Sequence, residues 1–337
     1  MTATDTASAT ELRNLGYGAA FTETLRQIMA EDEDVFVAGE DVGAAGGVFG
    51  SFTGLQAEFG PMRSVDTPIS EQAIVGLGIG AAVSGLRPVV DLMFMDFVLV
   101  AMDQIVNQAA KLKYMFGGNT SLPMTITTNA GAGLSAAAQH SQSLEALLCH
   151  VPGLKVVMPS NSHDVKGLLT ASIREDNPVV FIKHKRLLGQ KGHCPEALFE
   201  IPLGRASISR PGDDLTIVTY GRMVSESLKA ASVLAGEGVD VEVIDLRTLQ
   251  PVDTDAIVAS VQRTNHCVVA HEAVRFGGLG AEIASHVQEH AFDYLDAPVG
   301  RVGAPFSPVP FTPALESLYV PDAARIAEGV RSTLARS

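Results

Sequence analysis

The sequence predicts an α/β protein made of two successive open α/β domains. Its short apolar segments, for example residues 34–39 and 178–182, show almost no alternation between apolar and polar residues. Such runs are typical of parallel strands that are buried on both faces. Segments with helical periodicity separate them, and the whole pattern is interrupted once and then resumes. A chain of 337 residues is long enough for two such domains.

The first half alternates strands with helices. A helix is expected from Asp96, its candidate N-cap, to about Phe116, because apolar residues recur there at steps of three and four. A second helix is expected after Asn161, which is also a candidate N-cap. The expected strands cover residues 34–39, 87–94, 123–128, 154–159 and 178–182.

The alternation of strand and helix segments is interrupted from residue 187 to residue 213, and we interpret this segment as a linker. We therefore expect a flexible tail over residues 1–11, a first domain over 12–186 and a second domain over 214–337. In the second domain, strands are expected at residues 215–221, 239–247 and 266–273, and helices at 225–238, 253–264, 278–292 and from about 321.

The composition argues against several classes of protein. The net charge of -14 leaves no basic face for nucleic acid, and the one basic cluster, "KHKR" at residues 183–186, is interpreted as a solvated strand end. Acids interrupt the longest apolar stretch, residues 91–106, so no membrane span is expected. The first ten residues contain no arginine and do not resemble a signal or transit peptide.

The chain has three cysteines, Cys149, Cys194 and Cys267, which are widely spaced and odd in number. This usage indicates reduced thiols and a cytoplasmic protein. Each cysteine stands next to a histidine, but neighbouring side chains on a strand point to opposite faces and no Cys-x-x-Cys pair is present. A zinc site is therefore not expected.

Residues 66–82, "DTPISEQAIVGLGIGAA", place an acid ahead of an apolar, glycine-rich segment. A helix is expected here with Pro68 in its first turn, and the helix dipole favours the charged form of Glu71 close behind it. Each interior glycine costs about 1 kcal/mol relative to alanine, which indicates that another helix or a flat ligand approaches the backbone closely. The periodicity alone leaves Glu71 open between a surface acid and a functional one.

The same glycines raise the alternative of a nucleotide loop. "GLGIGAAVSG" contains Gly-x-Gly but has no glycine three residues after the second, and no strand is expected closely before it. A dinucleotide site needs a strand, a glycine-rich turn and then a helix, so this interpretation is disfavoured.

Two further segments carry candidate functional residues. His140 follows the strand expected at 123–128 and a loop of small residues, at an expected helix start, where open α/β sheets place catalytic groups. Glu40 and Asp41 follow the strand expected at 34–39 and precede a flexible loop, which is a candidate lid or partner contact. A structural histidine and a solvated loop are the alternatives, and the residues alone leave both open.

Stretches in both halves of the chain match one family in the order in which the family has them, among them "GEDVG", "DTPISE", "AAQHSQ", "HVPGLKVVMPS", "VEVIDLRTLQPVD" and "FTPALESLYVPD". Over residues 12–337 the chain resembles the beta subunits of thiamine-diphosphate-dependent 2-oxoacid dehydrogenases. The resemblance implies a transketolase-like pyrimidine-binding domain followed by a transketolase C-terminal domain, in an α2β2 assembly.

The resemblance also implies roles for individual residues. Glu71 corresponds to the acid that hydrogen-bonds the aminopyrimidine ring of thiamine diphosphate and stabilises its protonated nitrogen. His140 corresponds to a histidine that serves proton transfer and lipoyl-linked acyl transfer. Phe97 corresponds to an aromatic residue that packs on the pyrimidine ring, and Glu40, in "GEDVG", is a further candidate for cofactor binding.

Enzymes that hold the diphosphate of this cofactor use a Gly-Asp-Gly stretch and paired asparagines, and neither occurs here. The chain is therefore expected to supply half of a cofactor site. The alpha subunit is expected to bring magnesium and the groups that hold the diphosphate.

Some members of the family bind a structural potassium ion. The matching positions in this chain are Met124, Ser172, Ile173, Glu175 and Asn177, with Glu175 where aspartate is usual. The resemblance thus implies a second, non-catalytic cation site.

The leading hypothesis is the beta subunit of the decarboxylating component of a 2-oxoacid dehydrogenase complex. It would act on pyruvate or a branched-chain 2-oxo acid and pass the acyl group to lipoyl on an acyltransferase partner. "LMFMDF" is similar to acetoin dehydrogenase subunits and "HEAVRFGG" to branched-chain ones, so an acetoin dehydrogenase beta subunit is the alternative. A non-catalytic nucleotide-binding partner protein is the hypothesis from another class.

Overall fold

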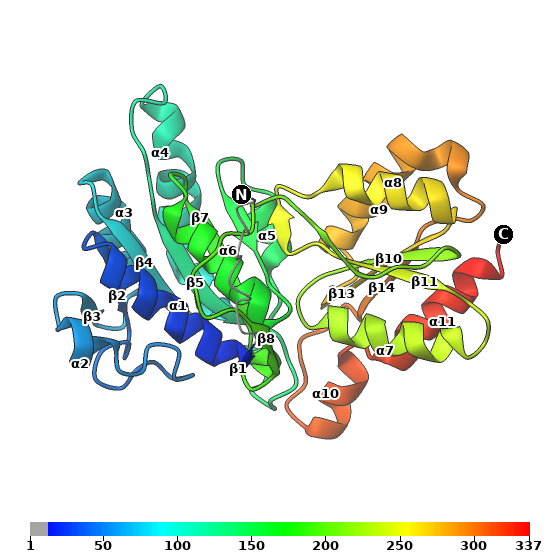
Figure 1. Ribbon diagram of the computed structural model, residues 1–337, viewed down its shortest axis with the longest axis horizontal. Coiled ribbons are helices and arrows are strands. Elements are labelled where there is room, and N and C mark those ends of the chain that lie inside the picture. Colours follow the sequence, from blue (N-terminus) through cyan, green and yellow to red (C-terminus); the bar gives the residue numbers. More distant parts are fainter. Residues whose placement is uncertain (1–12) are drawn as a thin grey trace, which may run out of the picture.

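The computed structural model describes residues 13–337, so the tail expected over residues 1–11 lies outside the described residues. Two α/β domains lie side by side, the first coloured blue to green and the second yellow-green to red (Figure 1). The first domain is built on a seven-stranded sheet and the second on a five-stranded sheet. The predicted fold class of two successive open α/β units is confirmed.

The first sheet has the strand order β12-β6-β7-β5-β4-β2-β3 and is parallel except at β12. Alternate residues of β2 face different cores: Val35 and Val37 pack on the side of α1 and α6, and Phe36 and Ala38 on the side of α3. Burial of both faces explains why the strands are unbroken apolar runs in the sequence. The strands are β2 (Val35–Gly39), β3 (Ser64–Asp66), β4 (Arg87–Phe94), β5 (Thr125–Ala130), β6 (Lys155–Val157), β7 (Val179–His184) and β12 (Thr248–Gln250).

Helices cover both faces of this sheet. On one face α1 packs against α6, and on the other α3 packs against the turns that follow β4. The helical elements are α1 (Tyr17–Glu31), α2 (Leu55–Phe59), α3 (Glu71–Val83), η1 (Met95–Ala101), η2 (Gln104–Ala109), α4 (Ala110–Met115), α5 (Glu145–Cys149), α6 (Ser162–Arg174) and η3 (Lys185–Leu187).

The second sheet has the order β14-β13-β10-β11-β9, with β9 antiparallel at its edge. α7 and α11 pack together on one face, and α8 and α9 pack together on the other. Its elements are β9 (Ser207–Arg210), β10 (Leu215–Thr219), α7 (Met223–Ala235), β11 (Val241–Asp245), α8 (Thr254–Thr264), β13 (Cys267–Val274), α9 (Leu279–Ala291), η4 (Phe292–Tyr294), β14 (Gly300–Ala304), α10 (Pro313–Tyr319) and α11 (Ala323–Leu334).

The segment expected to be a linker, residues 187–213, carries two paired strands. β8 (Lys191–Cys194) pairs antiparallel with β1 (Arg13–Gly16), and β9 joins the second sheet. Both strands are short and largely exposed, so they lack the apolar pattern by which a strand is recognised. In addition, β12 crosses back from the second half of the chain to pair with β6.

The helix expected from Asp96 to Phe116 is not a regular α-helix. A 3-10 turn (η1) and a π-helical turn (η2) precede the short α4. Asp96 does not cap it, because the Asp96 carboxylate accepts hydrogen bonds from the backbone and side-chain nitrogens of Gln142, at 3.3 and 2.8 Å. The predicted N-cap at Asn161 is confirmed: its side chain accepts a hydrogen bond from the Asp164 amide.

Two helix starts differ from the prediction. α3 begins at Glu71, so Pro68 lies before the helix, and the short edge strand β3 precedes it, where no strand was expected. His140 lies in a turn several residues ahead of α5, and not at a helix start. In both cases an irregular connection separates the strand from the helix.

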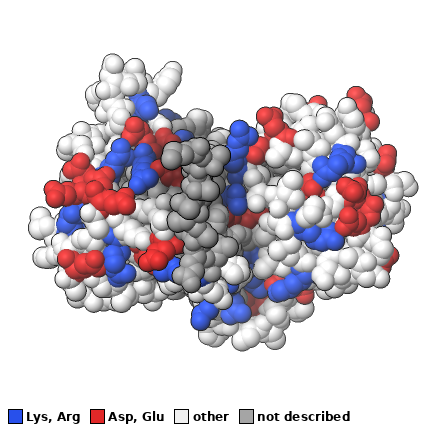
Figure 2. Space-filling model, viewed as in Figure 1, with Lys and Arg blue, Asp and Glu red and all other residues white. Residues whose placement is uncertain are grey.

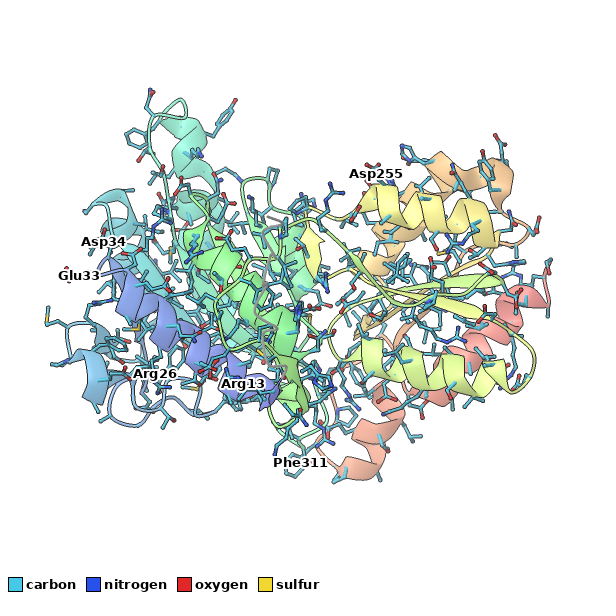
Figure 3. The ribbon with its side chains drawn as sticks, viewed as in Figure 1. Arg13, Arg26, Glu33, Asp34, Asp255 and Phe311 are labelled. Carbon is cyan, nitrogen blue, oxygen red and sulfur yellow. The ribbon has the colours of Figure 1, made fainter. Side chains whose placement is uncertain are left out.

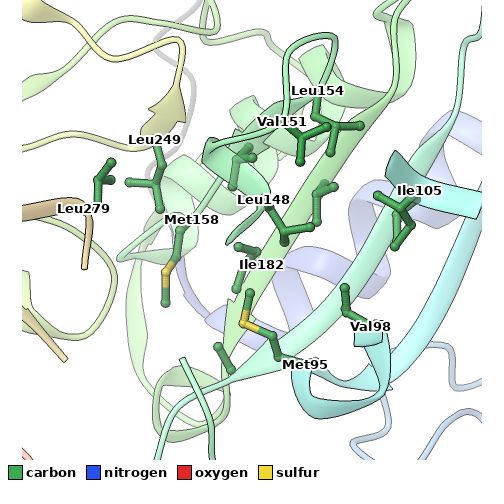
Figure 4. Close-up of a cluster of buried hydrophobic side chains, with 14 of the residues drawn as sticks. Met95, Val98, Ile105, Leu148, Val151, Leu154, Met158, Ile182, Leu249 and Leu279 are labelled. Carbon is green, nitrogen blue, oxygen red and sulfur yellow. The ribbon is translucent and has the colours of Figure 1, made fainter. Parts of the chain in front are cut away.

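One hydrophobic core runs through both domains. Leu249 and Leu279, from the second half of the chain, lie near Met158 and Leu148 of the first domain (Figure 4). All four side chains are buried. Because this shared core removes apolar surface of both domains from water, it holds the two sheets in a fixed relation.

The surface is charged but mixed. On the face drawn in Figure 2, acidic and basic side chains are interspersed, and no continuous basic band is seen there. Among residues 13–337, no helix is long and apolar enough to cross a membrane.

A buried carboxyl group lies where the chain passes between the domains. The Asp245 side chain accepts hydrogen bonds from the Ser160 hydroxyl and, at 3.0 Å, from the Arg247 amide. Burial raises the pKa of Asp245 from 3.8 to about 7, and the charge of Asp164 adds to this, against the opposing effect of Ser160 and Arg247. Between pH 3.8 and about 7, the folded state therefore keeps a proton on Asp245 that the unfolded state has released. This stabilisation is complete below pH 3.8 and is lost as pH rises through about 7.

We expect Asp245→Asn to flatten the pH dependence of stability. The amide cannot ionise, so between pH 5 and 8 the variant should lose less of its free energy of unfolding than wild type, by roughly 1–3 kcal/mol. Thermal unfolding at constant ionic strength measures this. Asp255→Asn is the control, because Asp255 is an exposed acid at the start of α8 (Figure 3). Identical pH profiles for wild type and Asp245→Asn would contradict the prediction.

Candidate active site

The carboxyl ends of four neighbouring parallel strands bring the candidate residues to one edge of the first sheet. β3, β2, β4 and β5 are adjacent in that order. Glu71 follows β3, Glu40 follows β2, Phe97 follows β4 and His140 follows β5. Residues far apart in the sequence therefore share the position at which open α/β sheets bind ligands.

Glu71 is the first residue of α3 and is half-buried. No side chain caps the start of this helix, so the amide groups of its first turn keep their positive potential. Glu40 lies close enough to interact electrostatically: its pKa is raised by burial, and then by the charges of Asp41 and Glu71. The two carboxylates thus lie within electrostatic range of each other after β2 and β3.

An aromatic cluster surrounds His140. Its imidazole ring lies 4.7 Å from the ring of Phe94 and 5.4 Å from that of Phe97, in edge-on contact with both. Phe94 also contacts Phe97 at 5.6 Å and Phe49 at 5.2 Å. These rings give the edge of the sheet an apolar wall beside the acids.

Phe94 and Phe49 were not predicted from the sequence. Phe94 was assigned to the expected strand 87–94, and Phe49 lies in the loop after Asp41 that was a candidate lid. Phe49 stands in a glycine-rich stretch and Phe94 in the apolar stretch "LMFMDF", and neither context indicates contact with a distant histidine.

The structure brings the candidates together in two pairs. Phe97 contacts His140, and Glu40 interacts with Glu71. Within residues 13–337, no ion pair joins Glu71 to His140. The two pairs occupy neighbouring loops of the same sheet edge.

Buried polar groups hold the end of β4 that carries Phe94 and leads to Phe97. Met93 adopts a left-handed conformation (φ 54°), its amide donates to Asp91 at 3.1 Å, and its carbonyl accepts from Asn129 at 2.8 Å. Asp91 in turn accepts a hydrogen bond from Thr127 at 2.5 Å and lies 3.6 Å from the Lys183 ammonium group. This network aims the aromatic residues at the sheet edge.

The interpretation of "KHKR" as a solvated strand end is wrong. Lys183, His184 and Lys185 are buried, and only Arg186 is exposed. The Lys183 ammonium group lies over the ring of Phe21, 4.1 Å from its centroid, and burial lowers the pKa of Lys183 against the opposing charge of Asp91. A buried partner on another strand satisfies each of the first two side chains.

The glycines of α3 have different surroundings. A Cβ atom at Gly78 would lie 2.6 Å from Met124 Cε and 3.0 Å from Val90 Cγ1, so the helix backbone lies directly on the sheet. A Cβ atom at Gly80 would meet nothing within 4 Å, and one at Gly76 only Gln104 at 3.8 Å. A close approach is thus found at Gly78 alone, and it is made by side chains of Met124 and Val90 and not by the helix or flat ligand that was expected. The glycines lie inside the helix and not in a turn, which also argues against a nucleotide loop.

Alanine substitutions should have different effects on stability at Gly78 and at Gly80. Gly78→Ala should lower the free energy of unfolding of the chain by about 1–3 kcal/mol through overpacking. Gly80→Ala should leave it unchanged or raise it by up to about 1 kcal/mol through helix propensity. Thermal or urea unfolding of the purified variants measures both, and equal effects would contradict the assignment. If Gly80→Ala lowers stability only in the assembled complex, a partner covers the face of α3 that carries Gly80.

The residues of the expected potassium site are already engaged by other groups of the chain. The Ser172 carbonyl accepts a hydrogen bond from Thr125 at 3.2 Å and the Ile173 carbonyl from the Arg87 guanidinium at 3.1 Å. The Glu175 carboxylate lies 2.6 Å from the Lys155 ammonium group. The Met124 carbonyl accepts a hydrogen bond from the Val179 amide at 2.9 Å, and the Asn177 side chain accepts one from the Lys113 ammonium group at 2.9 Å.

Arg87, Lys155 and Lys113 thus already contact three of the five residues. The potassium site stays a prediction. In the part of the chain that the structure describes, no group of three or more His, Cys, Asp or Glu side chains is placed to hold a metal ion.

The family of the chain follows from its two domains. Residues 13–191 match the transketolase pyrimidine binding domain and residues 204–326 match the transketolase C-terminal domain. A solved structure described as "Split gene transketolase, inactive beta4 tetramer" superposes with a TM-score of 0.78 over 94% of this chain and 97% of that chain, at 24% identity. The fold and the site define a transketolase-like protein.

Individual relatives narrow this class. The chain is 48% identical over 332 residues to the beta subunit of acetoin:2,6-dichlorophenolindophenol oxidoreductase from Cupriavidus necator, covering 96% of this chain and 98% of the relative. It is 45% identical over 312 residues to the pyruvate dehydrogenase E1 component subunit beta from Rickettsia felis, covering 93% and 96%. The chain belongs to the family of beta subunits of thiamine-diphosphate-dependent 2-oxoacid dehydrogenases, which includes these pyruvate and acetoin enzymes.

Proposed function

We propose that this chain is the beta subunit of the decarboxylating component of a 2-oxoacid dehydrogenase complex, and that it works with an alpha subunit in an α2β2 assembly. The observation that carries the proposal is the position of Glu71 at the uncapped start of α3, on the sheet edge that also carries Phe97 and His140. This arrangement supplies one half of a cofactor site.

The residues at this edge fit the aminopyrimidine end of thiamine diphosphate. Glu71 offers a carboxylate to a ring nitrogen, Phe97 offers a half-buried aromatic face, and Glu40 lies close to Glu71. The Thr67 hydroxyl, just before α3, is buried and has no hydrogen-bond partner among residues 13–337, as expected where a polar ligand completes a site. The alpha subunit is proposed to supply magnesium and to hold the diphosphate.

When bound, thiamine diphosphate supplies a carbon nucleophile for the substrate ketone and accepts the electron pair of the bond that breaks. Glu71 is proposed to keep the pyrimidine nitrogen protonated, because a charged carboxylate stabilises the N–H form. Phe97 is proposed to fix the ring orientation, and His140 to move protons during acyl transfer. The wall formed by Phe49 and Phe94 is proposed to exclude water.

The acyl group is proposed to pass to a lipoyl group on a dihydrolipoyl acyltransferase partner, in the cytoplasm. A structural potassium ion at Met124, Ser172, Ile173, Glu175 and Asn177 is a further part of this proposal; Arg87 and Lys155 already contact Ile173 and Glu175 there.

A second candidate is an acetoin dehydrogenase beta subunit. Two relatives named as acetoin oxidoreductase beta subunits are 48% and 45% identical to this chain, against 45% for a pyruvate dehydrogenase subunit. The same site would then cleave the bond between the ketone carbon and the hydroxyl-bearing carbon of acetoin, and no carbon dioxide would be released.

Glu71→Gln, co-expressed with the alpha subunit, should assemble normally and lose most turnover. The amide is a weaker acceptor and carries no charge to hold the ring proton, so a loss of about 100-fold or more is expected. Turnover at saturating thiamine diphosphate is the measurement. Glu33→Gln, at an exposed acid in the turn after α1 (Figure 3), is the matched control. Turnover of the Glu71 variant near that of wild type would refute the role.

The chain alone should show no activity, and the reconstituted pair should act on one substrate class. We expect release of carbon dioxide from pyruvate or a branched-chain 2-oxo acid, assayed beside acetoin with lipoamide or an artificial electron acceptor. Robust decarboxylation by the single chain would show that the half-site proposal is wrong. Cleavage of acetoin without activity on 2-oxo acids would establish the second candidate.

A further inference from the structure

The loop that carries His140, residues 131–141, adopts an unusual backbone conformation. Gly131 and Gly133 have φ values of 95° and 99°, and the non-glycine residues Ser135 and Ala137 have φ values of 53° and 62°. Left-handed backbone at Ser135 and Ala137 is intrinsically unfavourable, so contacts from outside the loop must stabilise it.

Two carboxylates of the second domain supply such contacts. Glu316 accepts the amide of Gly133 at 2.7 Å with one oxygen and the amide of Ser135 at 2.9 Å with the other. Glu272 accepts the amide of Ala132 at 2.6 Å. Glu316 and Glu272 are only 4% and 5% exposed, and hydrogen bonds from amides to buried charged carboxylates are stronger than those between neutral groups.

Glu272 is itself held in its charged form. Its second oxygen lies 2.9 Å from His184 Nε2. Burial raises the pKa of Glu272, but His184 and Arg222 outweigh this effect and lower it. The position also explains Gly131, because a Cβ atom there would lie 2.0 Å from His184 Nε2 and would displace the histidine from Glu272.

The far end of the loop is fixed to the first domain. The Lys185 ammonium group donates to the His140 carbonyl, and the Gly131 amide donates to the Gln142 carbonyl at 3.3 Å. The loop is therefore closed on itself at Gln142 and tied to the second domain through its first five residues. A shift between the domains would reach His140 through these bonds.

We propose that Glu316 and Glu272 are positioning residues: they hold residues 132–135 so that His140 stays against Phe94 and Phe97. The inference rests on the proposed role of His140 and adds that the second domain, which is distant in sequence, sets the geometry of this histidine. Glu316 does so by accepting hydrogen bonds from two amides of the loop, and Glu272 by linking the loop to His184.

Glu316→Gln tests the proposal in the full chain assembled with its alpha subunit. A glutamine side chain has one oxygen acceptor, so one of the two amides loses its partner. Amide hydrogen exchange of peptides that cover residues 131–141 should become about tenfold faster, while the rest of the first sheet is unchanged. Turnover should fall about tenfold with little change in the KM for substrate, because His140 contributes to the reaction and not to initial binding.

Two further variants serve as controls. Glu316→Asp keeps the charge and should restore part of the exchange protection and of the turnover; it also carries the test if Glu316→Gln does not assemble. Glu328→Gln, at an exposed acid of α11, should change neither quantity.

The outcomes separate the inference from the proposed function. Unchanged exchange in residues 131–141 would overturn the inference whatever the activity. His140→Asn decides the remaining case: if it is inactive while Glu316→Gln combines fast exchange with full turnover, the positioning role is wrong. If His140→Asn has full turnover, the proposed role of His140 fails, and with it the catalytic part of this inference.

Discussion

The parallel pairing of β3, β2, β4 and β5 is the constraint on which the rest of the site depends. Parallel strands all end at the same edge, so one pairing pattern places the residues after four strands together without any local sequence relation between them. Both faces of the sheet must be buried for such a sheet to be stable, and the apolar side chains that point to both faces meet this need. The ordinary core of the protein thus creates the functional edge.

The second domain contributes more than a partner surface. It shares a hydrophobic core with the first domain, contributes strand β12 to the first sheet and places buried carboxylates against the loop that carries His140. Burying several acids between domains is expensive unless every charge has a partner. The amides of residues 132–135 are such partners, so the same hydrogen bonds satisfy the acids and order the loop.

The sequence predicted the architecture well because burial on both faces leaves a strong local signal. β4 was placed at residues 87–94 and the N-cap at Asn161 was assigned correctly, since both depend on neighbouring residues. Edge strands such as β8 and β12 were missed because pairing over long sequence separations leaves no local pattern. The burial of Lys183 was missed for the same reason: its partner Asp91 lies on another strand. At the site, Glu71 was singled out by its position, but its functional role came from resemblance, and Phe94 and Glu316 required the tertiary structure.

The acids of the chain divide into two sets, and the division supports the half-site interpretation. Glu272, Glu316 and Glu175 are each bound by amides or cations of the same chain, which leaves them little capacity for a ligand. Glu71 instead stands at an uncapped helix start, beside an acid whose pKa it raises and a buried hydroxyl without a partner among the described residues. Buried polar atoms without a partner also occur elsewhere among the described residues, for example at Asp96 and Glu145, so the unpaired Thr67 hydroxyl supports a bound molecule only together with the position of Glu71 at the sheet edge. The start of α3 therefore points to Glu71, the residue that the family resemblance also indicates.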